Sequence, residues 1–201
     1  MIRPSPCGVL FDMDGVLIFS TDVWFAVYNE TLAHFGHARI GREEFLRIFG
    51  NGTQADRAMY MPERTVEEID GAYRRFFAER LGDIRLNPEA PGVLARLRER
   101  GVATSLATNT NRGLAEAILG RLGVSGLLTA FACADEAGAG KPDPAVVRLA
   151  AERLGLPLSD CLFVGDSRYD EEAARAAPVA FAGYRYGGPP TRIEALSEIS
   201  G

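Results

Sequence analysis

The chain has 201 residues, of which 47% are hydrophobic and 24% are charged, and its formal net charge is −5. These values predict a folded globular protein and argue against a disordered chain or a broad basic surface for nucleic acid. No apolar run approaches the roughly 18 residues that a membrane span needs, so we expect no membrane partner. Three cysteines without CxxC spacing argue against a disulfide framework or a zinc site. With no signal-peptide pattern at the N-terminus, we expect a cytoplasmic protein.

Short apolar runs alternate with helical patterns along most of the chain. The runs cover residues 8–11, 102–107, 131–134, 161–164 and 179–181. The helical patterns cover residues 89–100, 112–122, 144–154 and 170–177. Strands that alternate with helices of this length are typical of a parallel sheet with helices on both faces. We therefore predict an α/β fold, a doubly wound, Rossmann-like parallel sheet domain.

The stretch 17–85 interrupts this alternation. It contains helical patterns at 22–36, 42–49 and 65–81 and no strand-like run, and the third pattern opens with a capping box at Thr65. A stretch of this kind cannot be one crossover of the sheet. We predict an inserted all-α domain at 17–85 and a core domain made of 1–16 and 86–201.

Polar residues cluster where the predicted strands end. In an open α/β sheet, ligands bind outside the carboxyl ends of the strands. The polar residues at these ends are Asp12, Asp14, Thr108, Asn109, Lys141, Asp166 and Asp170. Several carboxylates in one cleft repel one another unless a cation lies among them. Hard oxygen ligands with little His or Cys nearby suit Mg²⁺, so we predict a magnesium site here.

Such a set of residues can carry phosphoryl chemistry. A carboxylate that faces phosphorus can attack it and form an aspartyl-phosphate, and a second carboxyl can protonate the leaving oxygen. Thr108 would ligate phosphate oxygens, and Lys141 would neutralise their charge. Lys141 is the single lysine among the 22 basic residues, and all of the others are arginine. Because an ammonium is a compact point charge that a planar guanidinium cannot imitate in a tight site, this lysine is a candidate functional residue.

Four motifs follow one another at these strand ends, and together they resemble the haloacid dehalogenase superfamily of phosphatases. They are FDMDGVL (11–17), LATNT (106–110), GKPDP (140–144) and VGDSRYDEEAARAA (164–177). The insertion at 17–85 is similar in position and size to the small helical cap of that superfamily. The re-entry segment PGVLARLRERG (91–101) makes the phosphoglycolate phosphatase-like group the best match.

The resemblance implies a role for each strand-end residue. Asp12 would be the nucleophile and a metal ligand, and Asp14 the general acid/base that also offers its backbone carbonyl to the metal. Thr108 and Asn109 would bind phosphate, while Lys141 would hold the phosphoryl group and Asp12 in place.

The last of the four motifs carries two more acids. The resemblance implies that Asp166 completes the metal site and that Asp170 supports Lys141 or the metal shell. The true dehalogenases of the superfamily lack an acid at the position of Asp14, so its presence argues against dehalogenase chemistry.

Two departures from the family pattern stand out. Phe19 replaces an acid that relatives commonly carry after the first motif, which weakens substrate inferences from that region. The C-terminus is short, so we expect a frayed or missing sixth strand before the closing segment 191–199.

Other interpretations of single residues stay open. Thr108 and Asn109 could begin a helix, and Asp170 could be the N-cap of its own helix. His34 and His37 lack a third ligand, which argues against a metal site. One arginine of the insertion could reach a substrate carboxylate; the candidates are Arg39, Arg42, Arg47, Arg57 and Arg64.

The predicted activity is magnesium-dependent hydrolysis of a small-molecule phosphate monoester, phosphoglycolate-like or a sugar phosphate, through an aspartyl-phosphate. The expected partner is thus a small phosphorylated metabolite; the sequence leaves open whether the protein is a monomer or a homodimer. The alternatives are a phosphosugar mutase of the same family and a catalytically silent binding or signalling subunit. Hinge candidates for opening the cap are residues 15–16 and 85–88.

Overall fold

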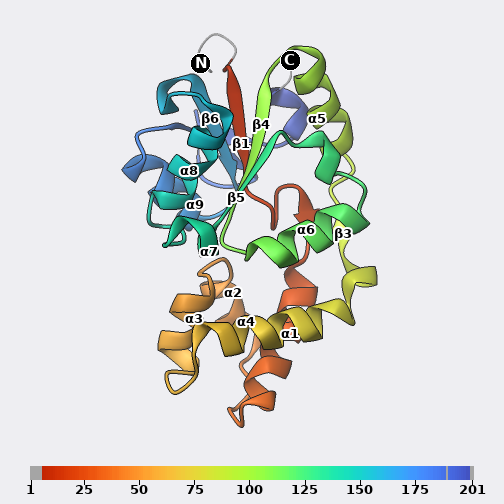
Figure 1. Ribbon diagram of the computed structural model, residues 1–201, viewed down its shortest axis with the longest axis vertical. Coiled ribbons are helices and arrows are strands. Elements are labelled where there is room, and N and C mark those ends of the chain that lie inside the picture. Colours follow the sequence, from red (N-terminus) through yellow and green to blue (C-terminus); the bar gives the residue numbers. More distant parts are fainter. Residues whose placement is uncertain (1–5, 189, 200–201) are drawn as a thin grey trace.

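The computed structural model describes residues 6–188 and 190–199, and its main sheet has six parallel strands in the order β5-β4-β1-β6-β7-β8 (Figure 1). The strands are β1 (Gly8–Phe11), β4 (Ala103–Thr108), β5 (Ala130–Cys133), β6 (Cys161–Gly165), β7 (Ala180–Tyr184) and β8 (Arg192–Ile193). This order confirms the predicted doubly wound α/β fold. The ends of the predicted core domain, residues 1–5 and 200–201, lie outside the described residues.

Helices cover both faces of the sheet because successive strand side chains point to opposite faces. Val9 and Phe11 pack into one buried cluster, and Leu10 between them packs into a second cluster on the other face. The first face is covered by α5 (Ala90–Glu99) and α6 (Arg112–Arg121). The second face is covered by α8 (Ala145–Leu154) and α9 (Arg168–Ala176).

The chain changes direction at the centre of the sheet. From β1 it proceeds outward through β4 to β5, and then it crosses back to β6 on the opposite side of β1. The loops after β1, β4 and β6 therefore leave the sheet side by side. This is the place where open α/β sheets bind ligands.

Four helices of the insertion gather beyond the carboxyl ends of the strands, in the orange to yellow part of Figure 1. They are α1 (Thr21–His34), α2 (Arg42–Ile48), α3 (Thr53–Tyr60) and α4 (Val66–Ala78). The capping box predicted at Thr65 is present, with Glu68 as its second member. An aromatic cluster holds α1 against α4, with Trp24 packed edge-on to Tyr73 and tilted against Phe77.

The sequence patterns missed several short elements. Helix α3 lies between the helical patterns predicted at 42–49 and 65–81. Two residues of the insertion form β2 (Ile18–Phe19), which pairs with β3 (Arg85–Leu86). The expectation of a strand-free insertion was therefore wrong. The sixth strand, expected to be frayed or missing, is present as the two-residue β8 beside β7.

The remaining elements are short connectors around the sheet. They are α7 (Ala134–Ala137) and the 3₁₀ turns η1 (Leu81–Asp83), η2 (Ser125–Leu127), η3 (Leu158–Asp160) and η4 (Leu196–Ile199). Cys133 and Cys161 are buried strand residues. Within residues 6–188 and 190–199, no helix combines the length and the apolar character needed to cross a membrane.

Candidate active site

The loop after β1 carries two of the predicted site residues into the crevice. Asp12 follows the last residue of β1, and its backbone N–H donates to the Val164 carbonyl of β6 at 2.9 Å, which fixes the start of the loop. Gly15 then turns the chain with φ of +82°, and a Cβ at this position would lie 1.8 Å from Asp166 Oδ2. Only glycine allows this turn beside the carboxylate of Asp166.

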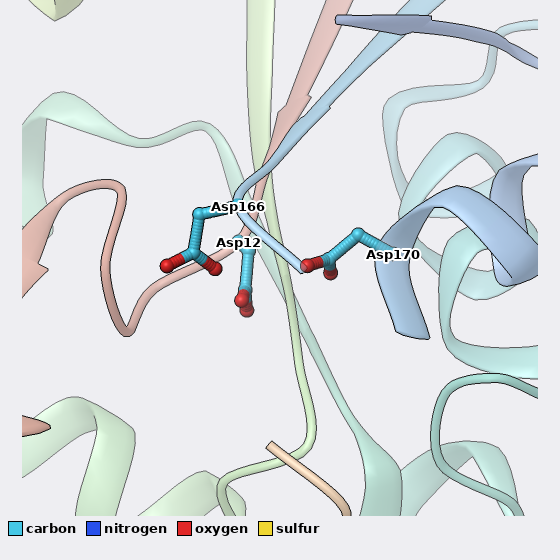
Figure 2. A group of neighbouring side chains, drawn as sticks. All are labelled: Asp12, Asp166 and Asp170. Atoms are coloured by element: carbon cyan, nitrogen blue, oxygen red, sulfur yellow. The ribbon is translucent and has the colours of Figure 1, made fainter. Parts of the chain in front are cut away.

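Three carboxylates meet at this edge of the sheet. Asp12, Asp166 and Asp170 each offer an oxygen, and the three oxygens lie within 4.8 Å of one another. Figure 2 shows that they come from the loop after β1, the turn after β6 and the first turn of α9. Burial, and then the charges of Asp12 and Asp170, raise the pKa of Asp166 well above its ordinary value. A divalent cation would relieve this repulsion, and the all-oxygen donor set fits Mg²⁺.

Lys141 lies on the other side of the same carboxylates. Its ammonium is 2.7 Å from Asp12 Oδ1 and 2.7 Å from Asp170 Oδ1, and it donates to the Ala107 carbonyl at 3.1 Å. Burial alone would lower the pKa of Lys141, but Asp12 and Asp170 outweigh this effect and raise it. The side chain is therefore a fixed, buried positive charge beside Asp12.

Asp170 is held by the start of its own helix. Ser167 is the N-cap of α9, and Asp170, the third residue of this helix, completes a capping box with it. The alternative interpretation of Asp170 as the N-cap of its helix is therefore wrong. Its Oδ2 accepts from the Ser167 N–H at 3.0 Å, which leaves Oδ1 to Lys141. Gly165 makes room for this arrangement, since a Cβ there would lie 2.3 Å from the Asp170 Cβ.

Asp14 points to a different set of partners. Its carboxylate accepts hydrogen bonds from the hydroxyl of Ser20, from Trp24 Nε1 at 2.9 Å and from Thr110 Oγ1 at 3.1 Å. Burial raises the pKa of Asp14, and these donors oppose the rise. The Asp14 carboxylate is not part of the group formed by Asp12, Asp166 and Asp170.

The sequence did not indicate any of the three donors to Asp14. Trp24 lies within the helical pattern at 22–36 and Ser20 directly follows Phe19, and neither belongs to one of the four motifs. The one available signal for Thr110 was its place in the LATNT motif.

The two predicted phosphate ligands differ in how many hydrogen bonds their side chains already make within the protein. Thr108 is buried, and its Oγ1 accepts from the Thr110 N–H at 3.2 Å. The side chain of Asn109 joins three segments: it donates to the carbonyls of Gly50 and Lys141 at 2.8 and 2.9 Å, and it accepts from the Lys141 N–H at 2.7 Å. Neither residue begins α6, whose N-cap is Asn111.

A cavity of about 230 Å³ joins the strand ends to the insertion. From the sheet it is lined by Asp12, Asp14, Thr108, Asn109, Thr110, Asn111, Lys141, Asp166 and Ser167. From the insertion it is lined by Trp24, Tyr28, Phe45, Leu46, Ile48, Phe49, Gly50, Asn51, Gly52, Thr53, Asp56, Asp70 and Tyr73. Phe19 is not among the described residues that line this cavity. It lines a separate surface hollow together with Arg42 and Arg85.

Neither histidine of the insertion reaches this cavity. His37 Nε2 lies 2.8 Å from Glu63 Oε1, and His34 packs against the rings of Phe35 and Phe76. Among the described residues that line the cavity there is also no arginine.

Comparisons with known proteins agree with this architecture. The family model of the haloacid dehalogenase-like hydrolases matches residues 8–178. A phosphoglycolate phosphatase of Yersinia pestis is 31% identical over 188 residues, which cover 90% of this chain and 81% of the relative. A plasmid-encoded phosphoglycolate phosphatase of Cupriavidus necator is 32% identical over 196 residues, with 92% and 84% covered.

A solved structure shares the fold. CbbY from Rhodobacter sphaeroides, crystallised in complex with phosphate, superposes with a TM-score of 0.84 at 22% identity, and 96% of each chain is covered. The curated relatives confirm the predicted family and the predicted class of enzyme, a phosphoric monoester hydrolase. The chain belongs to the haloacid dehalogenase-like hydrolase family.

Proposed function

We propose that this hydrolase is a magnesium-dependent phosphatase that releases phosphate from a small phosphorylated metabolite through an aspartyl-phosphate on Asp12. The observation that carries the proposal is the position of Asp12 between a buried ammonium and two further carboxylates. Lys141 Nζ lies 2.7 Å from Asp12 Oδ1, and Asp166 and Asp170 complete the acidic group. A buried carboxylate oriented in this way suits nucleophilic attack on a phosphoryl group.

In the first step, an oxygen of the Asp12 carboxylate attacks phosphorus and the bond from phosphorus to the ester oxygen breaks. Asp14 donates its proton to the departing oxygen, which leaves as an alcohol. Burial raises the pKa of Asp14 above its ordinary value, which favours the protonated form that this role needs. Lys141 offsets negative charge on the phosphoryl oxygens while it holds Asp12 in place.

In the second step, water attacks phosphorus of the aspartyl-phosphate. Asp14, now ionised, takes a proton from this water, and the bond between phosphorus and Asp12 breaks. Free phosphate leaves and both aspartates return to their starting state. The ester oxygen and the attacking water thus use the same acid/base in turn.

Mg²⁺ would be held by Asp12 and Asp166, with Asp170 beside them and the backbone carbonyl of Asp14 as a further oxygen. When bound, the ion supplies charge stabilisation for the phosphoryl oxygens. Thr108 would offer its hydroxyl to the phosphoryl group. For Asn109 we propose the backbone N–H as the phosphate contact, because its side-chain amide already joins Gly50 to Lys141.

We propose that residues 17–85 act as a cap over a core of 1–16 and 86–201, and that the cap closes to exclude water. Two chain connections join these parts, and they contact each other. The Asn87 N–H donates to the Leu17 carbonyl at 2.9 Å, and its side chain donates to the Val16 carbonyl at 2.8 Å. These contacts support hinges at residues 15–16 and 85–88 that move together.

The test is phosphate release from p-nitrophenyl phosphate and from a panel of phosphorylated metabolites, each with Mg²⁺ and with EDTA. The proposal predicts release with Mg²⁺ and its loss with EDTA. Release that is equal in both conditions would contradict the metal dependence. Absence of release from every compound, by protein shown to be folded, would contradict the phosphatase assignment.

A further inference from the structure

We infer that the cavity selects phosphate esters whose leaving group presents hydroxyl groups, and that it disfavours esters that carry a carboxylate. This inference rests on the phosphatase function proposed above and deepens it. The part of the cavity that belongs to the insertion, away from Asp12, would contact the leaving group rather than the phosphoryl group. Its chemistry is acidic and aromatic, and it offers hydrogen-bond acceptors to a ligand.

A substrate carboxylate would find no positive side chain to pair with. Lys141 is the single Lys, Arg or His among the described residues that line the cavity, and Asp12 and Asp170 already hold its ammonium. The insertion contributes two carboxylates instead, Asp56 and Asp70. We call the side of the cavity that carries Asp56 and Asp70 the acidic wall. Placing a third carboxylate against this wall costs electrostatic free energy, because like charges repel most where little water screens them.

Asp56 lies at the buried end of this wall. It is 8% exposed, and its Oδ2 accepts a hydrogen bond from the Tyr73 hydroxyl at 2.9 Å. Burial raises the pKa of Asp56 to about 7, so the group carries charge only at a cost in this environment. A ligand hydroxyl that donates to the carboxylate would lower this cost, whereas a ligand carboxylate would increase it.

A second acid and a buried hydroxyl extend the same wall. Asp70 of α4 accepts from Thr53 Oγ1 of α3 at 2.6 Å, which joins the two helices. Tyr28 also lines the cavity, and burial together with the nearby Asp56 raises the pKa of its hydroxyl. The hydroxyl therefore keeps its proton and adds a neutral polar group to this side of the cavity.

The start of α3 also lines the cavity, at Gly52 and Thr53, and the N-terminus of a helix ordinarily favours an anion. Here the first turn of the helix carries its own carboxylate, that of Asp56. The partial positive charge of these amides is therefore already offset within the helix. A bound anion would therefore gain less electrostatic stabilisation here than at the N-terminus of a helix whose first turn has no acid.

Matched pairs of substrates test the inference directly. Phosphoglycolate and hydroxyethyl phosphate differ only by a carboxylate in place of a hydroxymethyl group. Phosphoglycerate, esterified at the carbon farthest from its carboxylate, and glycerol phosphate form the same pair one carbon longer. We expect kcat/KM to be at least about tenfold higher for the hydroxylated member of each pair.

Two variants and one control assign the effect to the wall. Asp56→Asn and Asp70→Asn each replace an acid that can ionise with a neutral amide, and each should raise kcat/KM for the carboxylate member relative to its hydroxylated partner. Either variant suffices if the other fails to fold. Glu67→Gln changes an exposed carboxylate of α4 that does not line the cavity, and it should leave the ratio unchanged.

The outcomes separate the two proposals. Hydrolysis of both members with equal or better kcat/KM for the carboxylate ester would overturn the inference and leave the phosphatase function standing. The same holds if neither aspartate variant changes the ratio. Absence of hydrolysis of every ester and of p-nitrophenyl phosphate would instead overturn the phosphatase function on which the inference rests.

Discussion

The indole N–H of Trp24 donates a hydrogen bond of 2.9 Å to Asp14 Oδ1, and this bond links the first helix of the insertion to the loop after β1. Trp24 is itself held by the rings of Tyr73 and Phe77 on α4. The orientation of Asp14, the proposed acid/base, therefore depends on how the insertion sits over the sheet. A cap that moved away from the sheet would remove one of the three donors to this carboxylate.

Trp24→Phe should remove the donor and keep most of the ring packing. The hydrogen bond lowers the pKa of Asp14, so its loss should raise this pKa further. Since Asp14 must be protonated to act as the acid, the falling limb of the kcat/KM profile should move to higher pH. We also expect kcat to fall by about tenfold as the carboxylate loses orientation. A pH profile identical to that of the wild type would contradict this role for Trp24.

The contrast between Asp12 and Trp24 shows what the sequence could predict about this site. Asp12 and Asp166 directly follow the buried strands β1 and β6, and Lys141 lies in the loop after α7, which follows β5. The topology of a parallel sheet brings these loops to the same edge, so local patterns predicted that the three residues lie close together. Trp24 lies on α1 of the insertion, outside the four motifs. Its contact with Asp14 depends on the docking of the insertion onto the sheet, which no local pattern encodes.

The short elements show a similar limit. The helix α3 begins after Gly52, which has φ of +85° and no side chain to cap the helix, so its start lacks the Ser, Thr, Asp or Asn that usually marks a helix N-terminus. The strands β2 and β3 have two residues each and form only because the two connections of the insertion run side by side. Their pairing is tertiary in origin, unlike that of β1 and β6, whose apolar runs identified them.

Lys141→Arg tests the need for a compact positive charge. The ammonium fits between Asp12, Asp170 and the Ala107 carbonyl, all within 3.1 Å. A planar guanidinium is larger and cannot occupy this buried position without displacing a carboxylate. We expect kcat to fall by about a hundredfold or more. Activity of Lys141→Arg close to that of the wild type would show that charge alone suffices at this position.

Asp56 makes the stability of the protein depend on pH. Its folded pKa of about 7 lies above the ordinary aspartate value of 3.8, so the folded state holds the proton more tightly than the unfolded state. The contribution of Asp56 is therefore fully present below its unfolded pKa and is lost as pH rises through its folded pKa. The difference corresponds to at most roughly 4 kcal/mol.

Asp56→Asn removes this dependence. Relative to the wild type, the free energy of unfolding of the variant should be higher at about pH 8 than at about pH 5. Urea unfolding at the two pH values measures the change, with Glu67→Gln as the control for loss of an exposed carboxylate. If the difference in the free energy of unfolding between the wild type and Asp56→Asn is the same at both pH values, Asp56 titrates normally in the folded protein and the prediction is wrong.

The central claim is that Asp12 itself attacks phosphorus. The most direct test compares phosphate release by the wild type and by Asp12→Asn in the presence of Mg²⁺, with circular dichroism and thermal unfolding as evidence that both are folded. Asparagine keeps the shape of the side chain but is not a nucleophile toward phosphorus, so release by the variant should fall to the background rate. Near-normal release by folded Asp12→Asn would contradict the account.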